Sequence, residues 1–132
     1  MRSARLAVLA LAGALAACQA KAPATPPTAP QGKSAALRTM EQVAIAAQSC
    51  WFASRDPAFA PYRMANELNS FSGRPRILLV PSRSPESRPL LVVQAEGEPA
   101  RVDAFGPLMQ DALGPRISAD VRRWMAGSRA CA

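Results

Sequence analysis

The side chains that could do chemistry are few, and their types limit what the chain can catalyse. The 132 residues contain no histidine, which removes histidine-dependent nucleophilic catalysis, proton shuttling near neutral pH and ordinary zinc sites. Glu96, Glu98 and Asp103 gather around one predicted turn, and two carboxylates suffice to cleave a glycoside. Turn carboxylates are usually solvated, however, whereas a catalytic acid needs a cleft that raises its pKa. We therefore expect no catalytic residue, no metal and no cofactor.

Arginines provide the best candidate contact for a ligand. From Ser34 onward the chain has twelve arginines, no lysine and nine acidic residues, a formal charge of +3. Four arginines lie in or shortly before a polar loop at 82–89: Arg74, Arg76, Arg83 and Arg88. The planar guanidinium group suits phosphate and carboxylate, so these four are the candidate anionic contact. The alternatives are a solvated sheet edge that discourages aggregation and a compositional bias toward arginine.

Two cysteines lie in the chain after Ser34, Cys50 and Cys131. They are too far apart in sequence to form a Cys-x-x-Cys redox motif. A disulfide between them would close an 82-residue loop, counting both ends, and the chain-entropy model values that closure at about 4.5 kcal/mol. The alternative is a pair of buried or partner-bound thiols. Trp51 and Trp124 each lie near one of these cysteines and could fill the core or form a binding face.

The first residues have the features of an export signal. Residues 1–5 carry Arg2 and Arg5, and residues 6–15 are an apolar run. A run of that length suits a signal peptide and is too short for a permanent transmembrane helix. It ends in Leu-Ala-Ala-Cys at positions 15–18, which resembles the lipobox of bacterial lipoproteins. The resemblance implies that residues 1–17 are removed as a lipoprotein signal peptide and that Cys18 is lipidated.

The same resemblance implies a location. Two or three acyl chains on Cys18 give stable membrane anchoring. Gln19 stands where the family's inner-membrane retention signal usually has aspartate, so we expect the outer membrane, on the inner leaflet facing the periplasm. The lipidated Cys18 and a Pro/Ala-rich tether make up residues 18–33, and the tether can extend about 45 Å. Export excludes nucleic acid as a partner, and an oxidising periplasm favours the disulfide between Cys50 and Cys131.

Residues 34–132 predict one small domain. Apolar residues at steps of three and four predict a helix over 35–52, which Asp56 and Pro57 end. Strand patterns separated by turn residues follow at 62–69, 76–80, 90–95 and 101–105. A short helical turn is expected at 108–113 before Gly114 and Pro115 break it.

Ser118 is expected to cap a final helix over 120–126, with Asp120 in its first turn. The resulting fold class is α+β: an N-terminal helix, a four-stranded antiparallel meander and a C-terminal helix, packed on one face of the sheet. The expected function is that of a noncatalytic binding or scaffolding lipoprotein of the cell envelope. Its partner would be an envelope protein or the cell wall. The alternative is a lipoprotein that inhibits a lysozyme-type hydrolase, with the basic 82–89 loop entering an acidic cleft.

Overall fold

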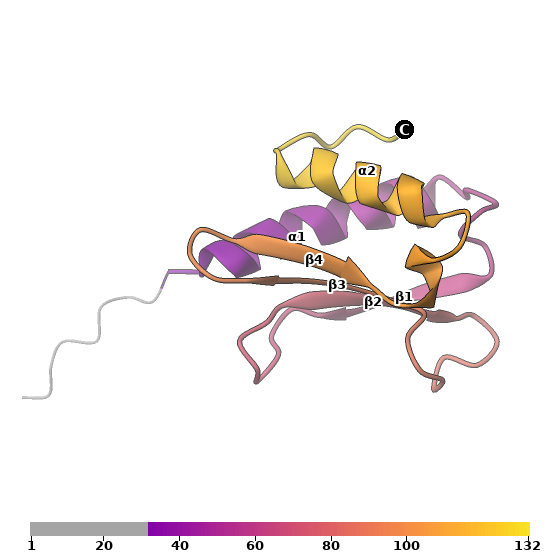
Figure 1. Cartoon of the computed structure of the whole chain (residues 1–132), viewed down its shortest axis with the longest axis horizontal. Coiled ribbons are helices and arrows are strands. Elements are labelled where there is room, and N and C mark those ends of the chain that lie inside the picture. The colour runs from indigo at the N-terminus through magenta and orange to yellow at the C-terminus, as the bar shows by residue number, and fades with distance from the viewer. Residues whose placement is uncertain (1–31) are drawn as a thin grey trace, which may run out of the picture. The chain divides into compact units, whose positions relative to one another are not determined.

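A computed structural model describes residues 32–132 (Figure 1). The predicted signal peptide, Cys18 and nearly all of the predicted tether lie outside the described residues. Within them the order of elements is a helix, four strands and a second helix, with short helical segments between. The strands form one antiparallel meander in the order β1-β2-β3-β4. The predicted α+β fold class is therefore confirmed.

Helix α1 spans Ala35–Ala47 and begins where the sequence predicts it. The Ser34 side chain accepts a 3.1 Å hydrogen bond from the backbone N–H of Leu37, as an N-cap does. The helix turns one face, with Met40 and Val43, into the core. It continues as the π-helical segment η1, Gln48–Ala53, so the helical stretch ends close to the predicted residue 52.

The sheet comprises β1 (Tyr62–Glu67), β2 (Arg76–Pro81), β3 (Leu91–Glu96) and β4 (Arg101–Phe105). Strand β1 is two residues shorter than the predicted 62–69. Figure 1 shows α1 and α2 on the same side of the sheet, as predicted. Side chains alternate along a strand, and those that face the helices are Ile77, Leu79, Leu91, Val93 and Ala95, all fully buried.

Helix α2 (Gly114–Met125) starts six residues before the predicted start at Asp120. The sequence predicts a break at Gly114 and Pro115, whereas the two residues form the first turn of α2, in which proline's missing N–H costs nothing. The segment before them is the short 3-10 helix η2, Pro107–Met109, in place of the helical turn expected over 108–113. As a consequence Asp120 lies in the middle of α2 and is 1% exposed. The prediction that Asp120 lies in the first turn of the helix is therefore wrong.

The core centres on an aromatic cluster between the two helices and the sheet. Trp51, Phe59 and Trp124 are 1%, 0% and 0% exposed. The rings of Trp51 and Phe59 are stacked with centroids 4.6 Å apart, and those of Trp51 and Trp124 are 5.0 Å apart. The tryptophans therefore fill the core, which was the first of the two predicted roles.

Candidate binding face

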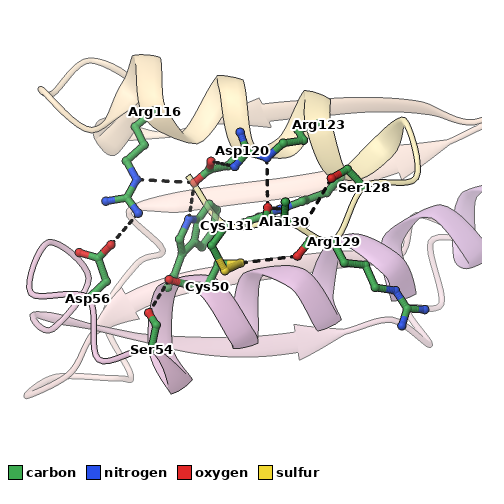
Figure 2. Close-up of a disulfide and its surroundings, with 12 residues drawn as sticks. Cys50, Ser54, Asp56, Arg116, Asp120, Arg123, Ser128, Arg129, Ala130 and Cys131 are labelled. Carbon is green, nitrogen blue, oxygen red and sulfur yellow. Dashed lines mark hydrogen bonds and ion pairs between the residues drawn. A yellow bond between two sulfur atoms is a disulfide. The ribbon is translucent and has the colours of Figure 1, made fainter.

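A disulfide between Cys50 and Cys131 ties the C-terminal tail to the end of the first helical stretch (Figure 2). The tail is also held by its Ala130 carbonyl oxygen, which accepts hydrogen bonds from Trp124 Nε1 at 3.0 Å and Arg123 Nε at 3.1 Å. Cys131 is exposed and Cys50 is buried. These contacts fasten the tail in place and leave no free thiol in the described part of the chain.

A network of charged side chains lies beside this disulfide (Figure 2). The buried Asp120 carboxylate accepts a 2.8 Å hydrogen bond from Trp51 Nε1 and pairs with Arg123. Arg116 Nε lies 3.6 Å from Asp120 Oδ2, and Arg116 Nη2 donates to Asp56 Oδ2 at 2.6 Å. The Arg116 hydrogen bond, followed by one from the backbone N–H of Ala58, lowers the pKa of the Asp56 carboxyl below its usual 3.8.

Within residues 32–132 the charged groups of this network pair with one another, and Arg116 Nε is buried there without a hydrogen-bond partner. Each carboxylate faces an arginine, and the Trp51 indole N–H donates one further hydrogen bond to Asp120. Arg116 also lies over the Phe59 ring, with the guanidinium carbon 5.2 Å from the ring centroid. A carboxyl that acts as a general acid near neutral pH needs a raised pKa, and the pKa of Asp56 is shifted in the opposite direction. The arrangement therefore serves to join α2 to the loop after η1.

The four candidate arginines fall into two separated pairs. Arg74 Nε lies 3.0 Å from Glu96, and Arg76 Nε donates to Glu67 at 2.6 Å, so both are paired at the start of β2. Arg83 and Arg88 lie beyond the other end of β2, exposed, in the loop to β3. Neither forms an ion pair with any residue from 32 to 132. The strand between the pairs is about 20 Å long, so the four do not converge on one anion.

The predicted turn carboxylates are likewise occupied or solvated. Glu96 pairs with Arg74 and Arg101, Glu98 accepts from the backbone N–H of Ala35 at 3.0 Å, and Asp103 is exposed. Across residues 32–132, no three acidic or cysteine side chains gather as metal ligands. No helix in that range is both long and apolar enough to cross a membrane.

The face of the sheet that the helices leave open carries a row of apolar side chains, which we name the apolar row. It runs across all four strands, because Ala65 pairs with Leu78, Leu78 with Val92, and Val92 with Phe105. Leu78, in the middle of the row, is only 8% exposed, whereas Phe105, at the β4 end, is 47% exposed. In Figure 1 the loops from β1 to β2 and from β2 to β3 project on this side of the sheet.

Polar side chains border the apolar row along one side and, at strand β1, on the other side. Toward one end of the strands the next row is Glu67, Arg76, Gln94 and Asp103, again in direct register. Toward the other end, exposed Arg63 pairs with Val80 near the 82–89 loop that carries Arg83 and Arg88. An apolar centre with a polar, arginine-containing rim is the usual anatomy of a protein interface. The open face is therefore the candidate binding face.

Sequence reasoning missed this face, although β2 contained a signal for it. Ile77, Leu78, Leu79 and Val80 are apolar at four successive positions. Because successive side chains point to opposite faces of a sheet, such a run requires apolar side chains on both faces of the strand. Ile77 and Leu79 enter the helix-covered core, which leaves Leu78 and Val80 for the open face.

Comparison with known proteins identifies no relative. No protein-family model, no curated protein and no solved structure matches the chain.

Proposed function

We propose that the protein is a noncatalytic binding module of the cell envelope, held on a membrane by lipid on Cys18. The observation that carries the proposal is the apolar row, which ends in a half-exposed aromatic side chain on the open face. Aromatic side chains, phenylalanine included, and arginines are enriched at protein interfaces relative to the rest of a protein's surface. The partner would be an envelope protein or the cell wall, contacted through the four strands.

Photo-crosslinking in cells tests the binding face. A benzoyl-phenylalanine at position 105 is expected to capture the partner, because this side chain is 47% exposed at the end of the apolar row. The same group at exposed Ala119 on α2 is the matched control, since α2 lies on the other side of the sheet. Adducts from position 119 alone, or from neither position, would contradict the proposal.

A charge on the face tests its contribution to affinity. Phe105→Asp is expected to weaken co-purification of the captured partner by about 2 kcal/mol or more, the usual effect of losing an aromatic hot spot. Met125→Asp on α2 is the control, because Met125 is similarly apolar and 36% exposed. Equal binding of the partner by the two variants would contradict the proposal that the open face is the binding face.

The membrane anchor has a separate test. Cells fed labelled palmitate are expected to label the wild-type chain and not Cys18→Ser, and the variant is expected to leave the membrane fraction. The purified wild-type protein is expected to begin at an acylated Cys18. A mature chain that begins elsewhere and carries no label would contradict the anchor without affecting the binding face.

Inhibition of a lysozyme-type hydrolase is the second candidate function. Its support is the exposed 82–89 loop, in which Arg83 and Arg88 have no acidic partner among residues 32–132. Such a loop suits an acidic cleft. The purified protein is expected to inhibit at micromolar concentration, and Arg83→Ser/Arg88→Ser is expected to abolish this. Full lysozyme activity across a panel of enzymes would exclude the candidate.

A further inference from the structure

Strand β1 is an edge strand, and half of its backbone groups point away from the sheet. Pro61 and Ser82 are opposite each other in the β1–β2 register, and the Ser82 N–H donates to the Pro61 carbonyl at 2.8 Å. In an antiparallel ladder the directly bonded pairs recur at every second residue. The backbone N–H and C=O groups that face β2 are therefore those of Arg63, Ala65 and Glu67. The backbone groups of Met64 and Asn66 point outward, away from the sheet.

The outward edge of β1 has neither of the two backbone features, a bulge or an internal proline, that block strand pairing. Its register with β2 runs from residue 62 to residue 67 without a bulge and without a proline inside the strand. Among residues 32–132, no turn, loop or side chain forms a hydrogen bond with the Met64 or Asn66 backbone from the outer side. Unpaired backbone donors and acceptors in this arrangement are a template for another strand.

The sequence of β1 is complementary to itself in the antiparallel direction. About a two-fold axis at Ala65, Arg63 lies opposite Glu67 of the second copy, and Glu67 lies opposite the second copy's Arg63. Opposite charges in directly facing positions stabilise a strand pair, whereas like charges destabilise it. We propose that two copies of this chain join through their β1 strands, antiparallel and centred on Ala65.

The hydrogen-bond pattern fits the same axis. It places Met64 opposite Asn66 of the second copy, and these are the residues whose N–H and C=O groups point outward. Each such pair can exchange two backbone hydrogen bonds. A shift by one residue would present side chains on the wrong face and would also separate Arg63 from the facing glutamate.

Apolar contacts would close the helix-facing side of this junction. The axis sets Tyr62 opposite Leu68 of the second copy, and both side chains are half-buried against the core. Next to them is a hollow of about 570 Å³ that Ile45, Met64 and Leu68 help to line. Ile45 is 53% exposed there, and a strand added to β1 would cover it.

The proposed pairing is closed and extends the binding face. A two-fold contact uses the same strand of both copies, so it ends at a dimer and does not propagate. Ala65 of each copy would meet at the axis, and the two apolar rows would become one row across eight strands. The dimer does not depend on the proposed function, because its argument rests on β1 alone.

Engineered cysteines test the register directly in the full-length protein, exported so that Cys50 and Cys131 are already paired. Residues facing across a non-hydrogen-bonded pair have Cα atoms about 4.5 Å apart, a separation that a disulfide can span. Ala65→Cys is expected to form a covalent dimer that a reductant dissolves. Arg63→Cys alone and Glu67→Cys alone are expected to remain monomers on a nonreducing gel, whereas coexpressed Arg63→Cys and Glu67→Cys chains form a covalent dimer.

Charge exchange tests the complementarity. Glu67→Arg places like charges opposite each other and is expected to raise the dimer dissociation constant at least tenfold in sedimentation experiments. Arg63→Glu/Glu67→Arg restores opposite charges and is expected to restore the dimer. The restoration cannot come from within one chain, because the double variant still lacks the Glu67 contact with Arg76. Asn66→Pro, which removes an outward N–H, is expected to give a folded monomer.

A wild-type chain that stays monomeric up to millimolar concentration would overturn the proposal. So would a dimer in which Ala65→Cys fails to crosslink, because the contact would then lie elsewhere. A monomer whose Met64 and Asn66 amides become protected only when an extended peptide is added would assign the edge to a different partner and would also overturn it.

Discussion

The Trp51 indole donates a 2.8 Å hydrogen bond to the buried carboxylate of Asp120, which joins the end of the first helical stretch to the middle of α2. Arg123 and Arg116 approach the same carboxylate. Removing one member of a buried charged group leaves the others uncompensated, at a cost of about 3–5 kcal/mol. Because the two arginine side chains are 30% and 33% exposed, we place the expected loss near the lower limit.

Asp120→Ala is therefore expected to lower the free energy of unfolding by about 3 kcal/mol. Asp120→Asn is expected to cost less, since its side-chain oxygen can still accept from Trp51. Urea denaturation followed by tryptophan fluorescence measures both. Asp111→Ala is the control, because Asp111 is exposed before α2, and a loss as large for Asp111→Ala as for Asp120→Ala would argue against the network.

Loss of the disulfide is the second expected source of instability. The link joins residues 81 positions apart, and its removal is expected to cost about 2–4.5 kcal/mol through the larger entropy of the unfolded chain. Cys50→Ser/Cys131→Ser should match the wild type measured with reductant. Equal urea midpoints for the oxidised wild type and the double variant would show that the link adds no stability.

The first residue of α2 could not be predicted from the sequence, although most of the elements could. The elements themselves could be predicted, because α1 has a helical apolar repeat with a serine cap, and the strands are separated by glycine and proline turns. Gly114 and Pro115 were ambiguous, since the same pair can end one helix or begin another. Tertiary packing determines that the pair begins a helix here. Gly114 has no side chain and lies against the Met109 carbonyl, which allows α2 to start at this residue.

The candidate binding face could not be predicted from the sequence either, because it depends on tertiary structure. Arg74, Arg76, Arg83 and Arg88 are close in sequence, but a strand of extended residues holds the first two about 20 Å from the last two. The apolar row, in contrast, takes one residue from each of four strands. Only the register between strands brings Ala65 and Phe105 into one row, and single-sequence patterns do not contain that register.

Acid is expected to weaken the contact between Asp56 and Arg116. The pKa of Asp56 is lowered in the folded state, first by the Arg116 hydrogen bond and then by the Ala58 N–H. A lowered carboxyl pKa gives stability that is present above the unfolded value of 3.8 and is lost as the pH falls through the lower folded value. Asp56→Asn is therefore expected to lose less stability than the wild type on acidification from neutral pH to below 3.8.

The measurement is the urea midpoint across that pH range for both proteins. Asp111→Asn, which changes an exposed carboxyl without a partner among residues 32–132, is expected to follow the wild type. If the urea midpoints of the wild type and of Asp56→Asn fell in parallel as the pH was lowered, Asp56 would not contribute to the acid sensitivity of the fold.

The close approach of Gly114 to Met109 gives the last prediction. A Cβ on Gly114 would collide with the Met109 carbonyl oxygen and lie 2.9 Å from its carbonyl carbon, both backbone atoms that cannot rotate away. Gly114→Ala is therefore expected to destabilise the fold by about 1–3 kcal/mol, the range for overpacking, although alanine favours a helix over glycine. Gly32→Ala, with nothing within 4 Å of the added Cβ, is the matched control and should leave the urea midpoint unchanged. A midpoint for Gly114→Ala at or above that of the wild type would mean that α2 can begin without this contact.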